Sequence, residues 1–314
     1  MLKRGWEVGS SQVGGERTGG GFASPFGFDR SLESHYKIDG SEGVRSLEDV
    51  LSEGKKSLQE KNNPNTKNGV TYALFGSSGC GKSTLLKKVF IEKLYCNDDV
   101  QKTADEYISV FFTGSKHSDA LDGVEKRDHE GCGRGTIVDS AGVDQDIYQW
   151  MYQMNYKYKK KYNFVVMIDD VLDVKQMPVI LPAFLTYRNM NISSAVSLQY
   201  LKMCPLSVRS SLYFVFLMPC NSREGIEGIV RAYMAMYLRG KTINDKISAY
   251  EELTRGYKCF LIDNLNHKAY YVDNNYNCVR LLPCLSEADN ETVSKEPNPG
   301  GEKGVPLFGF EKEE

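Results

Sequence analysis

No apolar stretch of the 314-residue sequence reaches ~18 residues, the length that a transmembrane helix needs. The chain begins MLKRGWEVGSSQVGGERTGGG, which lacks the apolar core of a secretory signal. These two absences predict a protein without a membrane span. We expect it in the cytoplasm or nucleus, or in a virus factory or virion if its source is viral.

An excess of charge of one sign is also lacking, because 39 basic residues stand against 41 acidic ones, for a net charge of -2. This balance argues against a strongly basic protein that coats nucleic acid. It does not exclude a motor that grips DNA with a few loops, because phosphate contacts depend on local charge.

Paired cysteines are absent as well. None of the eight cysteines forms a C-x-x-C pair, and no histidine cluster joins them at a zinc-binding spacing. We interpret them as small buried side chains in a reducing compartment. They lie at positions 80, 96, 132, 204, 220, 259, 278 and 284.

The two ends differ in composition from the middle of the chain. Residues 1–40 are rich in glycine and serine and have no hydrophobic period, which predicts a flexible arm. Residues 286–314 are acidic and rich in proline and glycine, which predicts a flexible tail. The tail ends in a short apolar cluster around Phe308, either a docking motif or part of a solvated terminus. The folded domain then spans residues 41–285.

Within this domain, short apolar runs alternate with helical patterns, which is typical of an α/β fold with a mainly parallel sheet covered by helices. The predicted strands are Val70–Phe75, Tyr107–Phe112, Phe164–Ile168, Ser194–Leu198 and Tyr213–Leu217. The predicted helices cover residues 44–61, 83–95, 146–158 and 223–238. Two further runs, 258–263 and 268–272, predict a C-terminal β-hairpin at the edge of the sheet.

The strongest motif follows the first predicted strand and fits G-x-x-x-x-G-K-[ST] in full, a P-loop (Walker A motif). Its glycines let backbone N–H groups surround a phosphate, and the helix that follows adds its positive end. The ammonium of Lys82 is expected to reach the β- and γ-phosphates, and the hydroxyl of Ser83 to bind Mg²⁺. The motif predicts a binding site for ATP formed by Gly76, Ser77, Ser78, Gly79, Cys80, Gly81, Lys82, Ser83 and Thr84.

A second acidic motif ends the third predicted strand, Phe164–Ile168, with Asp169 and Asp170. A P-loop enzyme needs a carboxylate that holds its metal, and the first acid after a strand faces the P-loop. We therefore predict that Asp169 binds Mg²⁺ through water. Asp170, one residue further, is predicted to orient or deprotonate the attacking water.

The sequence lacks the additional motifs that define several other P-loop classes. Residues 138–142 imitate the D-x-x-G switch of GTPases, but no strand ends in the N-K-x-D sequence that recognises guanine. An LSGGQ-like segment is missing, which argues against ABC transporter subunits. We also find no arginine-rich lid of the kind that nucleotide kinases carry.

The second half of the domain instead carries an arginine before a strand that ends in glutamine, Arg188 to Gln199, and then Asn221-Ser222-Arg223 after the next strand. This order resembles the FtsK–HerA superfamily of DNA-pumping ATPases, and in particular the genome-packaging ATPases of poxviruses, other large DNA viruses and virophages. The resemblance covers about Gly69 to Val230. It implies a RecA-like core that forms a homo-oligomeric ring and uses ATP and Mg²⁺ to move double-stranded DNA into a capsid, with a possible contact to capsid protein.

The resemblance also implies roles for single residues. Gln199, at the tip of the strand beside Asp169, would be the sensor that links hydrolysis to movement. An arginine from the next subunit would stabilise the transferred phosphoryl group. Arg223 is the first candidate for this finger, Arg188 the second, and Arg209 also competes.

The DNA contacts and the exact activity stay open. The segment 156–162 (YKYKKKY) mixes cations with aromatic rings, which suits nucleic acid, but lysines at a helix end are also favoured by the helix dipole. The long segment 113–142 is a candidate loop lining a ring's pore. Two other interpretations remain: a cellular or transposon translocase or helicase of the same superfamily, and an ATP-dependent switch without translocation.

Overall fold

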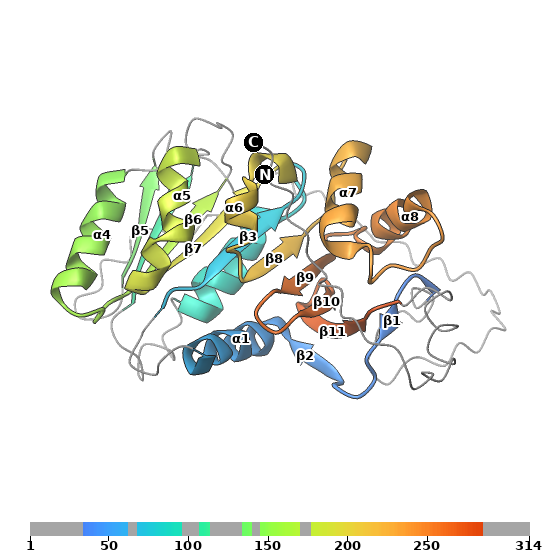
Figure 1. The fold of residues 1–314 in the computed structure, drawn as a ribbon, viewed down its shortest axis with the longest axis horizontal. Coiled ribbons are helices and arrows are strands. Elements are labelled where there is room, and N and C mark those ends of the chain that lie inside the picture. The colour runs from blue at the N-terminus through green and yellow to red at the C-terminus, as the bar shows by residue number, and fades with distance from the viewer. Residues whose placement is uncertain are drawn as a thin grey trace, which may run out of the picture.

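A single 11-stranded sheet crosses the molecule (Figure 1). The structure is a computed structural model, and it describes residues 34–61, 68–95, 107–113, 134–139, 145–169 and 177–284. The strands follow the order β1-β11-β10-β9-β8-β3-β7-β6-β4-β5, and β2 also pairs with β11. Their bounds are β1 Lys37–Ile38, β2 Val44–Ser46, β3 Thr71–Phe75, β4 Tyr107–Thr113, β5 Arg134–Asp139, β6 Asn163–Asp169, β7 Ile192–Leu198, β8 Phe214–Leu217, β9 Cys259–Asp263, β10 Lys268–Val272 and β11 Asn277–Leu282.

The sheet has a parallel half and an antiparallel half. From β8 to β5 all neighbours run parallel, and from β8 through β9 to β1 they alternate in direction. All five predicted parallel strands are present within a residue or two of their expected bounds, and so is the C-terminal hairpin, as β9 and β10. The predicted fold class, α/β with helices on both faces of the sheet, is confirmed.

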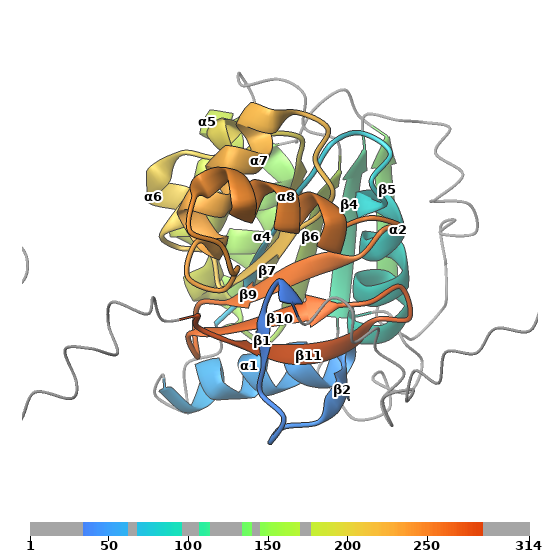
Figure 2. The same ribbon diagram turned by 90° about the vertical axis from the view of Figure 1, so that its right-hand side faces the viewer.

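Helices cover both faces of this sheet because alternate strand residues point to opposite sides. One core packs α4, α5, α6, α7 and α8 against the sheet, and a second packs α1 and α2 against its other face (Figure 2). Their bounds are α1 Leu47–Lys61, α2 Lys82–Leu85, α4 Gln145–Lys157, α5 Met177–Leu185, α6 Leu206–Arg209, α7 Arg223–Ile229 and α8 Ile243–Leu253. Wider helical turns continue α2 over Leu86–Tyr95 and α7 over Val230–Met234, and single turns lie at Tyr187–Met190 and Leu201–Met203. In the described segments, no helix is long and apolar enough to cross a membrane.

Three sequence interpretations need correction. Residues 44–46, predicted as the start of a helix, form strand β2 and pair with β11. Within the predicted loop 113–142, residues 134–139 form β5, parallel to β4, while most of the segment lies outside the described residues. The antiparallel part also extends beyond a hairpin, because β11 joins β10.

The predicted terminal arm and tail lie mostly outside the described residues. The described part of the arm, 34–40, contacts the body of the protein. Tyr36 is 1% exposed and its ring stacks on Tyr271 at 5.5 Å, while β1 pairs with the end of β11.

One buried amide fixes the start of β6, the strand that leads to Asp169. Asn155 in α4 is fully buried, and its Nδ2 donates to the carbonyl oxygens of Tyr162 at 2.9 Å and Met190 at 2.6 Å. Its Oδ1 accepts from the N–H of Tyr162 at 3.0 Å. The amide therefore joins α4 to the residues that precede both β6 and β7.

We predict that Asn155→Ala lowers the free energy of unfolding by about 2–4 kcal/mol, because it removes the donor to the Met190 carbonyl and the acceptor for the Tyr162 N–H. Urea denaturation followed by circular dichroism measures this loss. Asn189→Ala, at an exposed position nearby, is the control and should change stability by less than about 0.5 kcal/mol. Equal stability of the two variants would contradict the assigned role of Asn155.

Candidate nucleotide site

The P-loop leaves the carboxyl end of β3 and is held by the strands on both sides. The N–H of Gly76 donates to the carbonyl of Leu198 at the end of β7, at 3.1 Å. The N–H of Ser77 donates to the carbonyl of Pro219, just after β8, at 3.0 Å. The loop is thus fixed at the carboxyl ends of the central strands, and helix α2 begins at the end of the loop.

At two glycines of the loop, a side chain would either clash with its neighbours or strain the backbone. A Cβ at Gly76 would lie 2.6 Å from the sulfur of Cys80 and 2.9 Å from the Cβ of Met218. Gly81 adopts a φ of 96°, a left-handed conformation that side chains disfavour. The glycines therefore permit a tight turn whose N–H groups, with those at the start of α2, can surround a phosphate.

Lys82 is the cation of this loop, and it is only 6% exposed. Its ammonium donates to the carbonyl oxygens of Gly76 at 2.7 Å and Ser77 at 2.8 Å. The side chain is thus curled over its own loop, and a phosphate bound there would compete for the same donors. This placement suits recognition of a polyphosphate.

Asp169 ends strand β6 and accepts two hydroxyl hydrogen bonds. The Oγ of Ser83 donates to its Oδ2 and the Oγ of Ser197, on β7, donates to its Oδ1, each at 2.5 Å. The carboxylate is 5% exposed. A hydroxyl and a carboxylate side by side are the hard oxygen ligands that Mg²⁺ takes.

The donors present also fit the way Mg²⁺ binds beside phosphates. In the described part of the chain, no group of three or more His, Cys, Asp or Glu side chains could hold a metal alone. Mg²⁺ usually binds through one or two protein oxygens and completes its shell with water and substrate phosphates. Ser83 and Asp169 supply such a pair.

The thiol of Cys80 lies inside the loop as a neutral group. Burial raises its pKa, while the neighbouring Lys82 ammonium acts in the opposite direction. The net shift is upward, so the thiol stays protonated at neutral pH and fills the space beside Gly76. Cys80 thus packs inside the loop as a small apolar side chain.

Of the predicted sensor and the predicted base, only the sensor lies among the described residues. Gln199 directly follows β7, which lies between β3 and β6, and it is half-buried. The residue before it, Leu198, accepts the hydrogen bond from Gly76, so Gln199 starts next to the P-loop. Asp170, the predicted base, lies outside the described residues.

Among the candidate arginines, Arg223 lies at the carboxyl ends of the strands, as the P-loop does. It is exposed at the start of α7, and its Nη2 donates to Asn244 Oδ1 at 2.7 Å. Two residues earlier, the N–H of Asn221 donates to the hydroxyl of Ser77 at 2.7 Å. The segment that carries Arg223 therefore touches the phosphate loop.

Arg188 lies near the amino ends of the central strands, opposite the ends that carry the P-loop. Its carbonyl accepts from Gly69, before β3, and its guanidinium donates to the carbonyl of Ser211 at 3.2 Å and stacks over Tyr213 at 5.4 Å. The five residues of β3 put this edge about 17 Å from the P-loop of the same chain. Arg188 is thus far from its own chain's phosphates.

The third candidate, Arg209, is half-buried at the end of α6, which precedes β8 and so lies towards the same amino edge as Arg188. Its Nε donates to the carbonyl of Cys204 at 2.9 Å.

The basic and aromatic segment 156–162 also lies at that amino edge, at the end of α4 and before β6. Tyr156 is 72% exposed and Tyr158 is 42% exposed, and the ammonium of Lys157 lies 5.3 Å from the centre of the Tyr158 ring. These side chains are separate from the phosphate loop.

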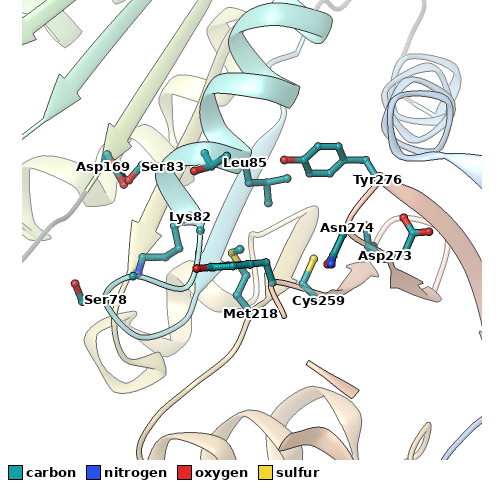
Figure 3. A pocket seen from close by; sticks show the side chains of 15 residues that line it. Ser78, Lys82, Ser83, Leu85, Asp169, Met218, Cys259, Asp273, Asn274 and Tyr276 are labelled. Atoms are coloured by element: carbon teal, nitrogen blue, oxygen red, sulfur yellow. Dashed lines mark hydrogen bonds between the residues drawn. The ribbon is translucent and has the colours of Figure 1, made fainter. Parts of the chain in front are cut away.

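A cavity of about 580 Å³ joins these elements. At one end it is lined by Ser78, Gly79, Gly81, Lys82, Ser83, Thr84 and Asp169. At the other end lie residues around β9 and the turn between β10 and β11. Figure 3 shows Asp169 and Ser83 on one side, Asp273, Asn274 and Tyr276 on the other, and Lys82, Leu85 and Met218 between them.

The residues that the sequence analysis missed include Ser197, Tyr257 and Asn274. No motif marks them. Ser197 meets Asp169 only because of the register between β6 and β7, in which Ile168 is opposite Val196. Tyr257 and Asn274 are far along the chain from the P-loop, and the antiparallel half of the sheet brings them to it.

Comparisons with known proteins give structural neighbours only, because no family model and no curated protein matches the sequence. The chain is similar to the genome packaging NTPase B204 from Sulfolobus turreted icosahedral virus 2, solved with ATP-gammaS, with a TM-score of 0.45 and 14% identity over 67% of this chain and 98% of that chain. It is also similar to EccC (ATPases 2 and 3) from Thermomonospora curvata, with a TM-score of 0.37 and 12% identity over 72% and 38%. A third neighbour is EssC (ATPases 2 and 3) from Geobacillus thermodenitrificans, with a TM-score of 0.39 and 13% identity over 73% and 42%.

At these low identities and TM-scores, we derive the function from the geometry of the site instead.

We predict that Ser197→Ala raises the Mg²⁺ concentration needed for nucleotide binding by roughly 10-fold, because it removes one of the two hydroxyls that orient Asp169. Titrating Mg²⁺ against a fluorescent ATP analogue measures the shift. Ser211→Ala is the matched control, since this buried hydroxyl donates to Val208 at the other edge of the sheet. If both variants needed the same Mg²⁺ concentration as the unmodified protein, Ser197 would have no part in the site.

Proposed function

We propose that this protein is a Mg²⁺-dependent ATPase that moves double-stranded DNA, and that it packages viral DNA into a capsid as a homo-oligomeric ring. The observation that carries the ATPase proposal is the pairing of Ser83 with the buried carboxylate of Asp169, 2.5 Å apart, beside the buried ammonium of Lys82. The loop after β3, the ammonium of Lys82 and the Ser83–Asp169 pair thus lie together at one end of one cavity, which supports this proposal.

The residues of this chain divide the work of phosphoryl transfer between them. Lys82 leaves the carbonyls of Gly76 and Ser77 and binds the β- and γ-phosphate oxygens. Ser83 and Asp169 would hold Mg²⁺, which would supply positive charge beside the phosphates. Asp170 orients or deprotonates the attacking water, and Gln199 hydrogen-bonds that water or the released phosphate.

The proposed ring requires that a residue reach the nucleotide of a neighbouring subunit. Arg223 is the first of the three candidates, because it is exposed in the single chain whereas Arg188 and Arg209 are half-buried. Its described side-chain hydrogen bond, to Asn244, is at the surface and can be exchanged for a phosphate. Coupling to DNA rests on the order of sequence features shared with DNA-pumping ATPases.

We expect ATP turnover that needs Mg²⁺ and rises when double-stranded DNA is added. Lys82→Ala should lower this turnover by about 100- to 1,000-fold, because no other lysine or arginine among the described residues lines the cavity. A phosphate-release assay with and without DNA measures both effects. Lys88→Ala, at an exposed position along the same helix, is the control and should keep full activity.

Comparing the Lys82→Ala variant with the effect of added DNA distinguishes a DNA translocase from an ATP-dependent switch. Turnover that is abolished by Lys82→Ala but unchanged by DNA would support an ATP-dependent switch and contradict the translocase. Normal turnover of Lys82→Ala would show that the nucleotide site itself is wrongly assigned.

A mixing experiment tests whether the arginine acts between subunits. Arg223→Ala should still bind ATP but lose about 1,000-fold or more in turnover, as expected for a finger that stabilises the transition state. Lys82→Ala and Arg223→Ala proteins, each inactive alone, should regain activity when mixed, because one interface then combines an intact P-loop with an intact arginine.

Arg231→Ala provides the matched control, since this exposed arginine pairs with Glu227 on the same helical segment. It should remain active by itself. Arg188→Ala and Arg209→Ala extend the comparison to the other candidates. If folded, oligomeric Arg223→Ala failed to complement Lys82→Ala while one of these did, the finger would be that arginine instead.

A further inference from the structure

The cavity continues well past the phosphate loop and changes character as it does so. Beyond Lys82 its lining turns apolar, with Leu85, Met218, Cys259 and Val272 all buried. Burial raises the pKa of the Cys259 thiol to about 12, so this group is neutral and adds to the apolar surface. A volume of about 580 Å³ is typical of sites for small organic ligands, and a phosphate group would fill only one end of it.

An exposed aromatic side chain stands at this apolar end. Tyr257 lines the cavity yet is 66% exposed, and among the described residues its ring makes no hydrogen bond or ring contact. A Cβ added to Gly81 would lie 3.3 Å from its Cδ1, which places the ring against the last glycine of the P-loop. A flat apolar surface is thus presented next to the phosphate site.

The backbone of Tyr257 is also unusual, with a φ of 68°. Bulky residues rarely adopt this left-handed conformation, and such strained positions gather at binding sites. Gly256 before it has a φ of 70°. Two left-handed residues in succession form the connection from α8 to β9 that carries the ring to the cavity.

Two polar side chains in the turn after β10 differ in the hydrogen bonds that they make. The carboxylate of Asp273 accepts from the N–H groups of Asn275 and Asn277, both at 2.8 Å, and from the amide of Asn277 at 3.0 Å. Asn274 is exposed, and its side-chain amide makes no hydrogen bond within the described segments. Asp273 therefore shapes the turn, while Asn274 is available to a ligand.

We propose that this end of the cavity binds the base of the nucleotide, with Tyr257 stacking on its face and Asn274 recognising its edge, and that it prefers adenine to guanine. This inference rests on the proposed ATP site and adds the residues that would bind and select its base. Aromatic side chains stack on any base, because every base has a π-face. Stacking on Tyr257 would therefore contribute affinity for any base, and the hydrogen bonds of Asn274 would contribute selectivity between bases.

The preference for adenine follows from the groups that are available. A carboxamide offers one donor and one acceptor side by side, which matches the N6 amino group and N7 of adenine, whereas guanine presents two acceptors, O6 and N7, on this edge. The O6 and N1–H groups on the other edge of guanine would also match a carboxamide, so the preference requires that the base present its N7 edge to Asn274. A carboxylate would suit the N–H groups of guanine, but Asp273 is occupied by its own turn. Asn274 thus selects for adenine.

Calorimetric titrations of the full chain with ADP, GDP and tripolyphosphate, all with Mg²⁺, test the stacking residue. Tyr257→Gly should weaken ADP binding by about 5- to 150-fold, and tripolyphosphate binding should not change. Glycine tolerates a φ of 68°, so this variant should be at least as stable as the unmodified protein, which separates loss of stacking from loss of fold. Tyr257→Phe keeps the ring and should bind ADP normally. Tyr156→Ala, which removes an exposed ring at the other edge of the sheet, should also bind normally.

Asn274→Asp tests the edge recognition. The carboxylate it introduces should lower the ratio of ADP to GDP affinity by about 10-fold or more, and tripolyphosphate binding should again stay constant. An unchanged ratio would overturn the role of Asn274.

The polyphosphate arm distinguishes failure of this inference from failure of the proposed function. Equal loss of ADP and tripolyphosphate binding in Tyr257→Gly, or no loss of either, would overturn the base site and leave the P-loop assignment intact. An unmodified protein that bound neither ADP nor tripolyphosphate would overturn both.

Discussion

The carboxylate of Asp169 ties together the three central strands of the parallel sheet at their carboxyl ends. It accepts one hydroxyl hydrogen bond from Ser83, just after the P-loop of β3, and another from Ser197 on β7. A carboxylate that is 5% exposed would be costly to bury without such partners. The same two bonds that satisfy the charge also orient the carboxylate towards the P-loop, so the fold itself supplies the geometry on which the proposed metal binding depends.

The junction between the parallel and antiparallel halves of the sheet gives the site its second end. Strand β9 pairs antiparallel with β8, which places the residues before β9 and after β10 beside the P-loop. The cavity therefore has a polar end made by parallel strand termini and an apolar end made by antiparallel connections. We propose that the polar end binds phosphates and the apolar end a base; the neutral thiol of Cys259 adds no charge to the apolar end.

The sequence predicts what depends on local pattern and misses what depends on register or on the edges of the sheet. The central strands were recognisable because they are buried on both faces and hence uniformly apolar, and the P-loop because its glycines are required by its turn. Strand β5 lies at one edge of the sheet and β11 pairs near the other, with buried and less buried residues mixed along it, so neither stands out as an apolar run. Ser197 could not be identified because a serine in a strand has no distinctive signal until its neighbour is known. Tyr257 and Asn274 lie in connections that reach the cavity only through the whole fold.

The most direct test of this account is a structure determined with Mg²⁺ and ATPγS. We expect the β-phosphate inside the loop between Gly76 and Ser83, the ammonium of Lys82 on phosphate oxygens, and the metal between Ser83 and Asp169. The base should lie against Tyr257. A nucleotide bound elsewhere on the protein, or phosphates in the loop with no metal near Asp169, would contradict the central claim that this sheet edge is the site of ATP hydrolysis.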